Sequence, residues 1–317
     1  MALAVRWLLA AILSALLSLL LARRLARLAD APMETPAGRA ARRFRANRGA
    51  VLALHLLVAL VVVTVLAPAL APHPPAAQPD IVALKSLPPS LAHPFGTDQY
   101  SRDVLSRVLY GARVSLAVAV LSVLVAITLG VAYGGVAGLA GGRVDAVLMR
   151  LNDALLSVPR VLLLIAVLAA LGRIDIEALV LLVGVTGWFG VSRIVRAEVR
   201  SVGATEFVTA ARALGIGRRR LLVRHVLPNA LSPVIVAATL AVGNVIVLEA
   251  GLSYLGIGVQ PPQASWGNIL QEGAAHIQAL WWMSLFPGLA IVATVMAVNL
   301  VGDGLRDALD PKQVDGR

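Results

Sequence analysis

The sequence has no cysteine, only two lysines and few charged residues of any kind. Without cysteine the chain cannot form a disulfide, a thiolate metal site or a cysteine nucleophile. Charged residues make up 14% of the 317 residues, whereas soluble domains contain about 25%. Hydrophobic residues make up 59%, and the mean hydropathy is +0.84. The composition therefore argues against an ordinary water-soluble enzyme and indicates an integral membrane protein.

The excess of positive charge is carried almost entirely by arginine. The formal net charge is +11, and 26 of the 28 basic residues are arginines. Such a chain can bind nucleic acid, a membrane surface or acidic ligands. Aromatic residues make up only 4% of the sequence, and long apolar runs separate the arginine clusters. Because single-stranded nucleic acid is bound by aromatic stacking within basic grooves, no nucleic-acid partner is predicted.

Six apolar runs reach the roughly 20 residues that a helix needs to cross a bilayer core of about 30 Å. They cover residues 51–70, 113–140, 144–171, 176–195, 230–250 and 280–301. The third is the least regular, because its first half contains Arg150, Asn152, Asp153 and Arg160. The sequence therefore predicts an all-α membrane protein with six core spans.

A further apolar run, residues 3–22, lies at the N-terminus and is interrupted only by Arg6. Signal peptides carry their positive charges before the apolar core. Here Arg23, Arg24 and Arg27 follow it, and Pro32 spoils the nearest cleavage site. We expect an extra membrane-spanning helix with its N-terminus outside; an interfacial helix and a signal peptide are the alternatives.

Two segments contain most of the arginines and predict the orientation of the chain. Residues 23–49 and 193–225 carry eight arginines each, together 16 of the 28 basic residues. Basic flanking segments remain in the cytoplasm, and the even number of predicted spans between them agrees with this placement. Residues 71–102, 172–175 and 251–279 are then expected to face outward, and the C-terminus to face the cytoplasm.

The outward segment after the first core span is rich in proline and should be extended and irregular. It becomes helix-like at residues 101–110, where Ser101 is the expected N-cap of an amphipathic helix on the bilayer surface. His73 and His93 stand among the prolines without a partner at ligand spacing. No metal site is predicted from them.

Residues 206–229 form the most informative segment, with the sequence EFVTAARALGIGRRRLLVRHVLPN. Phe207, Ala210, Ala211 and Leu214 follow helical spacing and predict a short helix with an apolar stripe. The glycines at 215 and 217 predict a turn, and a second helix follows. A cytoplasmic helix of this kind either inserts its stripe into a groove of a partner or rests on anionic lipid.

The choice between these readings follows from a resemblance. TAARALG, followed nine residues later by HVLPN, resembles the cytoplasmic EAA loop of ATP-binding-cassette (ABC) importer permeases. Four other segments resemble the C-type permease subunit of the dipeptide, oligopeptide and nickel branch. They are HPFGTDQYSRDVLSRVLYGARVSL from His93, EAGLSYLGIGVQPPQASWG from Glu249, WWMSLFPGLAIV from Trp281 and NLVGDGLRDALDP from Asn299. All five lie in the family order and cover nearly the whole chain.

The resemblance implies a type I ABC importer transmembrane domain with six core helices and a non-catalytic role. Its expected partners are a homologous B-type permease subunit, two ABC ATPase subunits and an extracytoplasmic substrate-binding protein. The expected location is the inner membrane of a bacterium, and no cofactor is expected. Di- or oligopeptide is the expected substrate on the breadth of the family alone; nickel or another small solute is the alternative.

On this basis we predict five parts of the chain. They are an extra N-terminal transmembrane helix (1–22), a basic cytoplasmic linker (23–50), the first core span with its proline-rich outer segment (51–110), a core permease domain (111–305) with a cytoplasmic coupling loop (201–229), and a cytoplasmic tail (306–317).

In the family the loop forms a coupling helix that docks in a groove of the ATPase subunit. The ATPase-coupling residues carried over to this chain are Glu206, Phe207, Thr209, Ala210, Ala211, Leu214 and Gly215. Thr209 departs from the family, which usually has an acidic residue there. Glu206 lies one turn earlier on the same face and is expected to replace it in part.

Polar side chains within membrane spans usually face a protein interior or a wet path. The set here comprises Asn152, Asp153, Arg160, Asn244, Glu249 and Asn299. Asn244 and Asn299 lie deepest and are the preferred residues for a translocation path. Asp153 and Arg160 lie nearer the cytoplasmic interface, where Arg160 can extend its head group to water. Glu249 lies near the outer end of its span and is a further candidate to contact a delivery protein or a substrate.

Small residues recur at every fourth position of the second core span, at Ala126, Gly130, Gly134, Gly138 and Gly142. Such a ridge lets two helix backbones approach closely. It can pack within this chain or against the partner permease, and the sequence leaves both readings open.

Several catalytic classes are excluded by their motifs. A P-loop needs glycine directly before its lysine, but Leu84 precedes Lys85 and Pro311 precedes Lys312. The chain also lacks the H-E-x-x-H and G-x-S-x-G motifs. Residues 302–304, Gly-Asp-Gly, resemble an aspartyl protease motif, which requires a second aspartate at matched depth. The rival transport class, an ATP-independent secondary transporter, predicts an inverted repeat and embedded carboxylates, and neither is evident.

Overall fold

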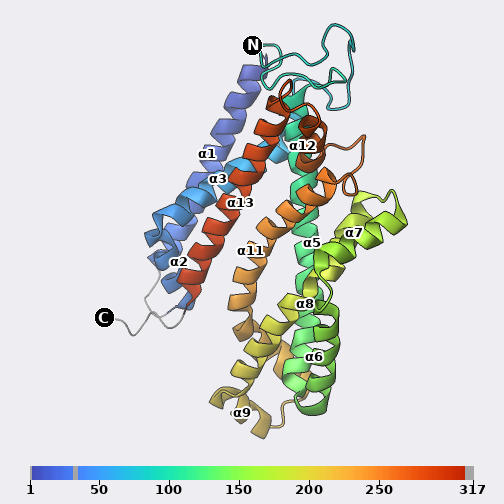
Figure 1. Cartoon of the computed structure of the whole chain (residues 1–317). Coiled ribbons are helices and arrows are strands. Elements are labelled where there is room, and N and C mark those ends of the chain that lie inside the picture. Colours follow the sequence, from blue (N-terminus) through green and yellow to red (C-terminus); the bar gives the residue numbers. More distant parts are fainter. Residues whose placement is uncertain (1, 31–34, 311–317) are drawn as a thin grey trace.

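The computed structural model describes residues 2–30 and 35–310 (Figure 1). In that part of the chain the regular secondary structure is helical, apart from one isolated bridge between Thr97 and Asp103, and irregular segments connect the helices. The helices are α1 (Ala2–Ala29), α2 (Pro36–Ala46), α3 (Arg48–Val65), α4 (Ala67–Leu70), α5 (Val104–Ala140), α6 (Gly142–Leu156), α7 (Arg160–Leu171), α8 (Ile176–Gly203), α9 (Glu206–Ala213), α10 (Arg218–Leu221), the π-helical turn η1 (Leu222–Val226), α11 (Leu227–Tyr254), α12 (Trp266–Ala274) and α13 (Trp282–Leu309). The all-α prediction is confirmed.

Six of the described helices are long and apolar enough to cross a membrane, and the N-terminal helix α1 is one of them. The predicted third core span, residues 144–171, is not one straight helix. It consists of α6 and α7, which are bent by 70° at the break between them. Pro159 lies in that break, where its ring and missing N–H prevent the helix from continuing. Counting this pair as one span gives seven.

The predicted surface helix at residues 101–110 is wrong in its boundaries and its position. Asp103, and not Ser101, is the N-cap: its side chain accepts a hydrogen bond from the backbone N–H of Ser106. Ser101 has a positive φ of 61° outside the helix. The helix then runs without a break from Val104 to Ala140, and residues 104–109 are buried in the chain rather than lying on a lipid surface.

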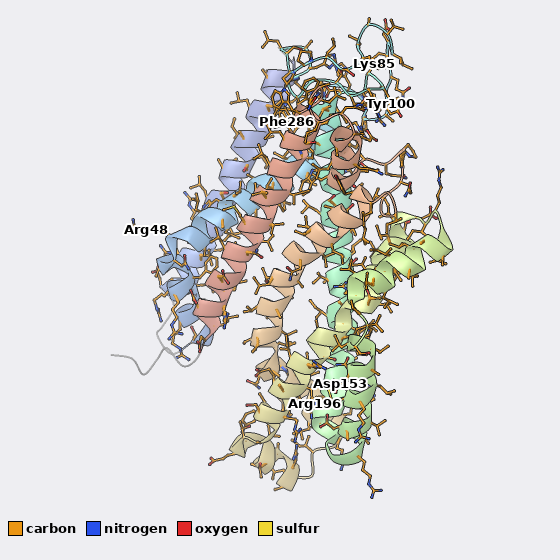
Figure 2. All side chains as sticks on the ribbon, viewed as in Figure 1. Arg48, Lys85, Tyr100, Asp153, Arg196 and Phe286 are labelled. Atoms are coloured by element: carbon orange, nitrogen blue, oxygen red, sulfur yellow. The ribbon has the colours of Figure 1, made fainter. Side chains whose placement is uncertain are left out.

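The two ends of the molecule agree with the arrangement that the arginines predict. Figure 1 shows α9 at the lower end of the molecule and α12 with the segment between α4 and α5 at the upper end, while α2 and the last turn of α13 lie at the lower end of the group formed by α1, α3 and α13. Figure 2 places Arg196 and Asp153 toward the α9 end and Lys85 and Tyr100 toward the opposite end. Both arginine-rich segments therefore lie away from the end that carries α12.

The five-part division of the chain stays a prediction, although α1 continues to Ala29, past the expected boundary at residue 22. Residues 31–34 of the basic linker, with Pro32, and residues 311–317 of the tail, with Lys312, lie outside the described residues.

The small-residue ridge packs within this chain, against α8. A methyl group built on Gly130 would lie 2.6 Å from a Val191 carbon, and one on Gly134 would lie 2.3 Å from the Ser192 carbonyl oxygen. On the facing helix, a methyl group on Gly184 of α8 would lie 2.6 Å from Val125. The contact between α5 and α8 at these glycines is called the seam below. Glycines on both helices therefore allow the two backbones to approach closely.

The seam does not include every residue of the predicted ridge. Gly138 also faces α8, where a methyl group would lie 2.8 Å from Val199. Gly142 has a φ of +54° and no neighbour within 4 Å of such a methyl group, so it serves the turn between α5 and α6 instead.

A largely buried group of four charged side chains, here called the Asp98 ion cluster, attaches the proline-rich segment between α4 and α5 to α12. Asp98 accepts hydrogen bonds from Arg102 (2.5 Å) and Arg107 (2.7 Å), and both arginines also donate to Glu272 of α12. Two carboxylates and two guanidinium groups balance one another, which offsets the cost of removing these charges from water.

The close approach of α5 and α8 can be tested with a matched pair of glycine substitutions. Gly134→Ala should lower the free energy of unfolding by about 1–3 kcal/mol, because its methyl group overlaps the Ser192 carbonyl. Gly190→Ala, whose methyl group meets nothing within 4 Å, should leave it unchanged or slightly raised. The midpoint temperature of unfolding of the purified chain in detergent measures both; equal shifts would contradict the seam.

Candidate coupling site and polar residues of the spans

The helix α9 ends in a Schellman cap and a turn that leads to α10. Gly215 follows the helix with a φ of +79°, which favours glycine. The backbone N–H of Ile216 donates to Ala211 O at 3.2 Å, and that of Gly215 donates to Arg212 O at 2.9 Å. This pair of bonds satisfies the last carbonyls of the helix. The turn predicted at Gly215 is therefore present, whereas Gly217 has a negative φ and precedes α10.

One face of α9 is anchored inside the chain. Val208 is fully buried and Ala211 is 8% exposed. Both belong to an apolar cluster with Val195 and Val199 of α8 and with Leu221. The i, i+3 spacing of Val208 and Ala211 places them on the same face. This anchor makes α9 an extension of the α8 end rather than a freely hanging helix.

A neighbouring face of α9 is apolar and exposed. Phe207 is 48% exposed and Leu214 is 82% exposed, and Ala210 lies between them on the same face. The predicted stripe of four residues is thus divided: Ala211 points into the chain, and the other three remain on the surface. The sequence pattern missed Val208, because a short helix with apolar residues on two faces does not show which one is internal.

The polar residues of α9 lie beside the exposed face. Glu206 and Thr209 are both exposed. The Thr209 hydroxyl donates to the Thr205 carbonyl within its own chain at 3.1 Å. A threonine that satisfies its hydroxyl locally offers a partner less than a carboxylate would.

Two aspartates of α6 pair with arginines of α8 near this end, in very different surroundings. Asp145 has a 7% exposed side chain and accepts hydrogen bonds from Arg196 and, at 3.3 Å, from Arg200. Asp153 pairs with Arg193, and both of these side chains are more than half exposed. Through Asp145, the side chains of Arg196 and Arg200 hold α6 against the part of α8 that leads into α9.

From the sequence, these arginines indicated only the orientation of the chain, and no pairing with Asp145 was predicted. A signal was present, since Arg196 and Arg200 are four residues apart and share one face of α8. Their common partner lies about 50 residues earlier in the chain, on another helix, so spacing alone did not indicate it.

The polar residues that the sequence singled out within the spans do not gather in one place. Asn152 is fully buried and donates to the Phe189 carbonyl of α8 at 3.2 Å. Arg160 does not extend toward the interface: it donates to the Val183 carbonyl of α8 at 2.6 Å. Both side chains therefore join α6 and α7 to α8 in this conformation.

Glu249 is enclosed by serines. It is fully buried, and its carboxylate accepts hydrogen bonds from Ser115 of α5 at 2.8 Å and from Ser253 at 2.7 Å. Ser115 also accepts from the backbone N–H of Trp266 at the start of α12 at 3.3 Å. In this conformation the carboxylate links three helices and is not open to a delivery protein.

Asn244 and Asn299 lie at the α11–α13 pair. Asn244 is exposed in the single chain, and Asn299 is half-buried. The Asn299 side-chain oxygen lies 3.1 Å from the place where a Cβ on Gly243 would stand, next to Asn244 in sequence. Of the five residues expected on the path, these are the two that the structure leaves close together and accessible.

Near the α9 end, α8, α11 and α13 enclose an open groove of about 920 Å³. Its polar lining comprises Glu198, Ser201, Asn229, Ser232, Arg306 and Asp310, and its apolar lining includes Ile194, Val236 and Leu240. The groove has mixed polarity, as expected for a surface that meets water or a polar solute inside a membrane protein.

The described chain is a bundle of candidate membrane spans with a short anchored helix, α9, at one end. Residues 126–315, more than half of the chain, match the family described as binding-protein-dependent transport system inner membrane component. Residues 35–89 match the N-terminal TM domain of oligopeptide transport permease C. The chain belongs to this family of transport-system inner membrane components, and the resemblance to the C-type subunit is confirmed.

Characterised and provisionally named relatives agree over most of the chain. The dipeptide transport system permease protein DppC of Bacillus subtilis (strain 168) is 41% identical over 274 residues, which cover 86% of this chain and 85% of the relative. A Brucella suis biovar 1 (strain 1330) protein, provisionally named a peptide permease, is 42% identical over 279 residues, 87% of this chain and 91% of the relative. A Brucella ovis protein with the same provisional description also shows 42% identity over 279 residues.

Family membership makes the chain a multi-pass inner membrane protein and a non-catalytic component of a transporter complex. The described helices have the lengths and hydropathy that this location requires.

The two aspartates of α6 provide a test of what holds the α9 end together. Asp145→Asn should lower the free energy of unfolding by about 1–3 kcal/mol, since it leaves two arginines without their carboxylate. Asp153→Asn, on the same helix, should change it by less than about 1 kcal/mol because its ion pair is exposed. Unfolding midpoints in detergent compare the two. An equal loss of unfolding free energy in both variants would show that burial of the ion pair does not determine its contribution to stability.

Proposed function

We propose that this chain is the C-type permease subunit of an ATP-driven importer of di- or oligopeptides. The names of its relatives support the substrate class: one is a dipeptide transport system permease and others are provisionally named peptide permeases. We further propose that a homologous B-type permease subunit completes the membrane path, that two ABC ATPase subunits drive it, and that an extracytoplasmic binding protein delivers the peptide.

The observation that carries this proposal is that α9 has one buried and one exposed apolar face. Its inner face is anchored by Val208 and Ala211, while Phe207 and Leu214 are exposed and face away from the chain. An apolar helix face of this kind fits a groove in a protein partner. We propose that α9 is the coupling helix, with Glu206, Phe207, Thr209, Ala210, Leu214 and Gly215 at the ATPase dock and Ala211 in the anchor.

Continuity of the chain explains how a movement at this dock reaches the membrane. The helix α8 is unbroken from Ile176 to Gly203 and leads into α9, and α10 and η1 continue into α11. Displacement of α9 must therefore move the ends of two spans. ATP can drive such a change only if it binds the two conformations of the complex with different affinity.

For the path itself we propose the surface of α11 and α13 that includes Asn244 and Asn299, continued by the groove of about 920 Å³ at the α9 end. Asn152, Asp153 and Glu249 fit a supporting role in this conformation, since each is paired within the chain. The proposed orientation places α9, the arginine-rich segments and the C-terminus in the cytoplasm.

Purification of the intact complex in mild detergent tests the assembly. Mass spectrometry should find this chain together with a second permease subunit, two ATPase subunits (identical or different) and a binding protein that carries a peptide. Recovery of the chain without any ATPase would contradict the proposal. Uptake into vesicles that persists without ATP but is abolished by an uncoupler would indicate a secondary transporter. A metal or another small solute on the binding protein would show that the proposed substrate class is wrong.

The exposed face of α9 can be tested in the complex. Leu214→Ser should lower substrate-stimulated ATP hydrolysis by at least about tenfold, because a central apolar contact is worth about 2 kcal/mol or more. Leu91→Ser is the matched control: Leu91 is fully exposed at the opposite end of the chain and should have no effect on ATPase coupling. Normal coupling with Leu214→Ser would exclude this face from the dock.

The departure at position 209 gives a second comparison. If Glu206 replaces the usual acidic residue, Glu206→Ala should weaken ATPase coupling more than Thr209→Ala does, since the Thr209 hydroxyl is bonded within its own helix. ATP hydrolysis and peptide uptake by reconstituted complexes measure the difference. Intact coupling with Glu206→Ala would show that Glu206 does not compensate.

A further inference from the structure

Two histidines that the sequence left without a partner meet a carboxylate in the folded chain. Ligand atoms of His73, His93 and Asp103 all lie within 4.8 Å of one another. The His93 Nδ1 atom is 2.9 Å from Asp103 Oδ1, and the rings of His73 and His93 lie 5.3 Å apart. Spacing in the sequence does not indicate Asp103 as a partner, because it lies ten residues after His93 and beyond a loop.

The carboxylate of this group is held in place by the start of α5. Asp103 is 2% exposed, and its Oδ2 atom accepts hydrogen bonds from the backbone N–H of Ser106 at 2.8 Å and from the Ser106 hydroxyl at 2.7 Å. Its Oδ1 atom is directed at His93. The oxygen that faces the histidines is therefore oriented by bonds to the other oxygen, as the outer-shell partners of metal ligands do.

His73 is brought to the same place through its backbone. Its N–H donates to the Ser106 hydroxyl at 3.2 Å, the same hydroxyl that bonds Asp103. His93 is 8% exposed, whereas His73 is exposed. One side of the group is thus rigid and enclosed, and the other is an imidazole at the surface that can rotate and leaves an entry route for an ion from solvent.

Two imidazole nitrogens and one carboxylate oxygen form a donor set that suits a divalent transition-metal cation. Tetrahedral Zn²⁺ with bonds near 2.0–2.1 Å places its ligand atoms about 3.3 Å apart. The His93–Asp103 separation of 2.9 Å is already close to this value, so rotation of the exposed His73 ring would close the remaining distance. Water would occupy the fourth position.

We propose that His73, His93 and Asp103 form a binding site for a divalent transition-metal cation such as Zn²⁺. The site lies at the end opposite α9, in the segment between α4 and α5 (Figure 1). Its ligands come from both ends of the proline-rich segment and from the cap of α5. A bound ion would cross-link this segment to the first turn of the longest helix and restrain its movement.

Zinc binding by the full-length chain tests the site without ATP, peptide or partner subunits, so its outcome is independent of the transport proposal. The chain is purified in detergent with an affinity tag that contains no histidine. Equilibrium dialysis against buffered Zn²⁺, followed by elemental analysis, should find one tightly bound ion per chain. His73→Gln should weaken that binding by at least about tenfold, without lowering the unfolding midpoint of the metal-free chain, since the His73 side chain is exposed.

Two further variants make the result specific. Asp103→Asn keeps an oxygen that can cap α5 but removes the charge, and should also lose the ion. His276→Gln removes an exposed histidine elsewhere at the same end and should bind Zn²⁺ as the unaltered chain does. The proposal is overturned if the unaltered chain binds no Zn²⁺ above the level of His73→Gln, or if His276→Gln loses the ion equally.

Discussion

The close approach of α5 and α8 is the constraint on which the rest of the structure depends. In a bilayer, helices gain little from the hydrophobic effect and associate through close packing, which glycine permits. Gly130 and Gly134 on α5 and Gly184 on α8 leave no room for a methyl group. Because α5 begins at the proline-rich segment and α8 ends at α9, this seam connects the two ends of the molecule that partners are proposed to meet.

Ion pairs join further helices to α5 and α8 near each end of this seam. Toward α9, Asp145 joins α6 to the arginines of α8. At the opposite end, the Asp98 ion cluster joins the start of α5 to α12. A buried ion pair adds little net stability, but an unpaired buried charge is costly, so these clusters favour one arrangement of the helices over others. If α9 is the coupling helix that we propose, these contacts would let it transmit a displacement to the helices at its base.

Much of the fold could be predicted from the sequence, because hydropathy and arginine placement are local properties. They indicated the apolar spans, the common side of the two basic segments and the helix followed by a turn at Gly215. They did not indicate the bend at Pro159 as a division of one span, nor the continuation of α5 back to Val104. Both depend on what packs around the helix ends, which periodicity does not report.

What the sequence by itself determined is the class of protein: the apolar runs require a membrane, and the ordered motifs identify a transport-system permease. Only the tertiary structure decided how individual side chains are used. It turned Ala211 inward while leaving Leu214 exposed, enclosed Glu249 among serines, and brought His73, His93 and Asp103 together. The physical reason is distance along the chain: helix formation and membrane partition depend on neighbours in sequence, whereas burial and pairing depend on residues that only folding places in contact.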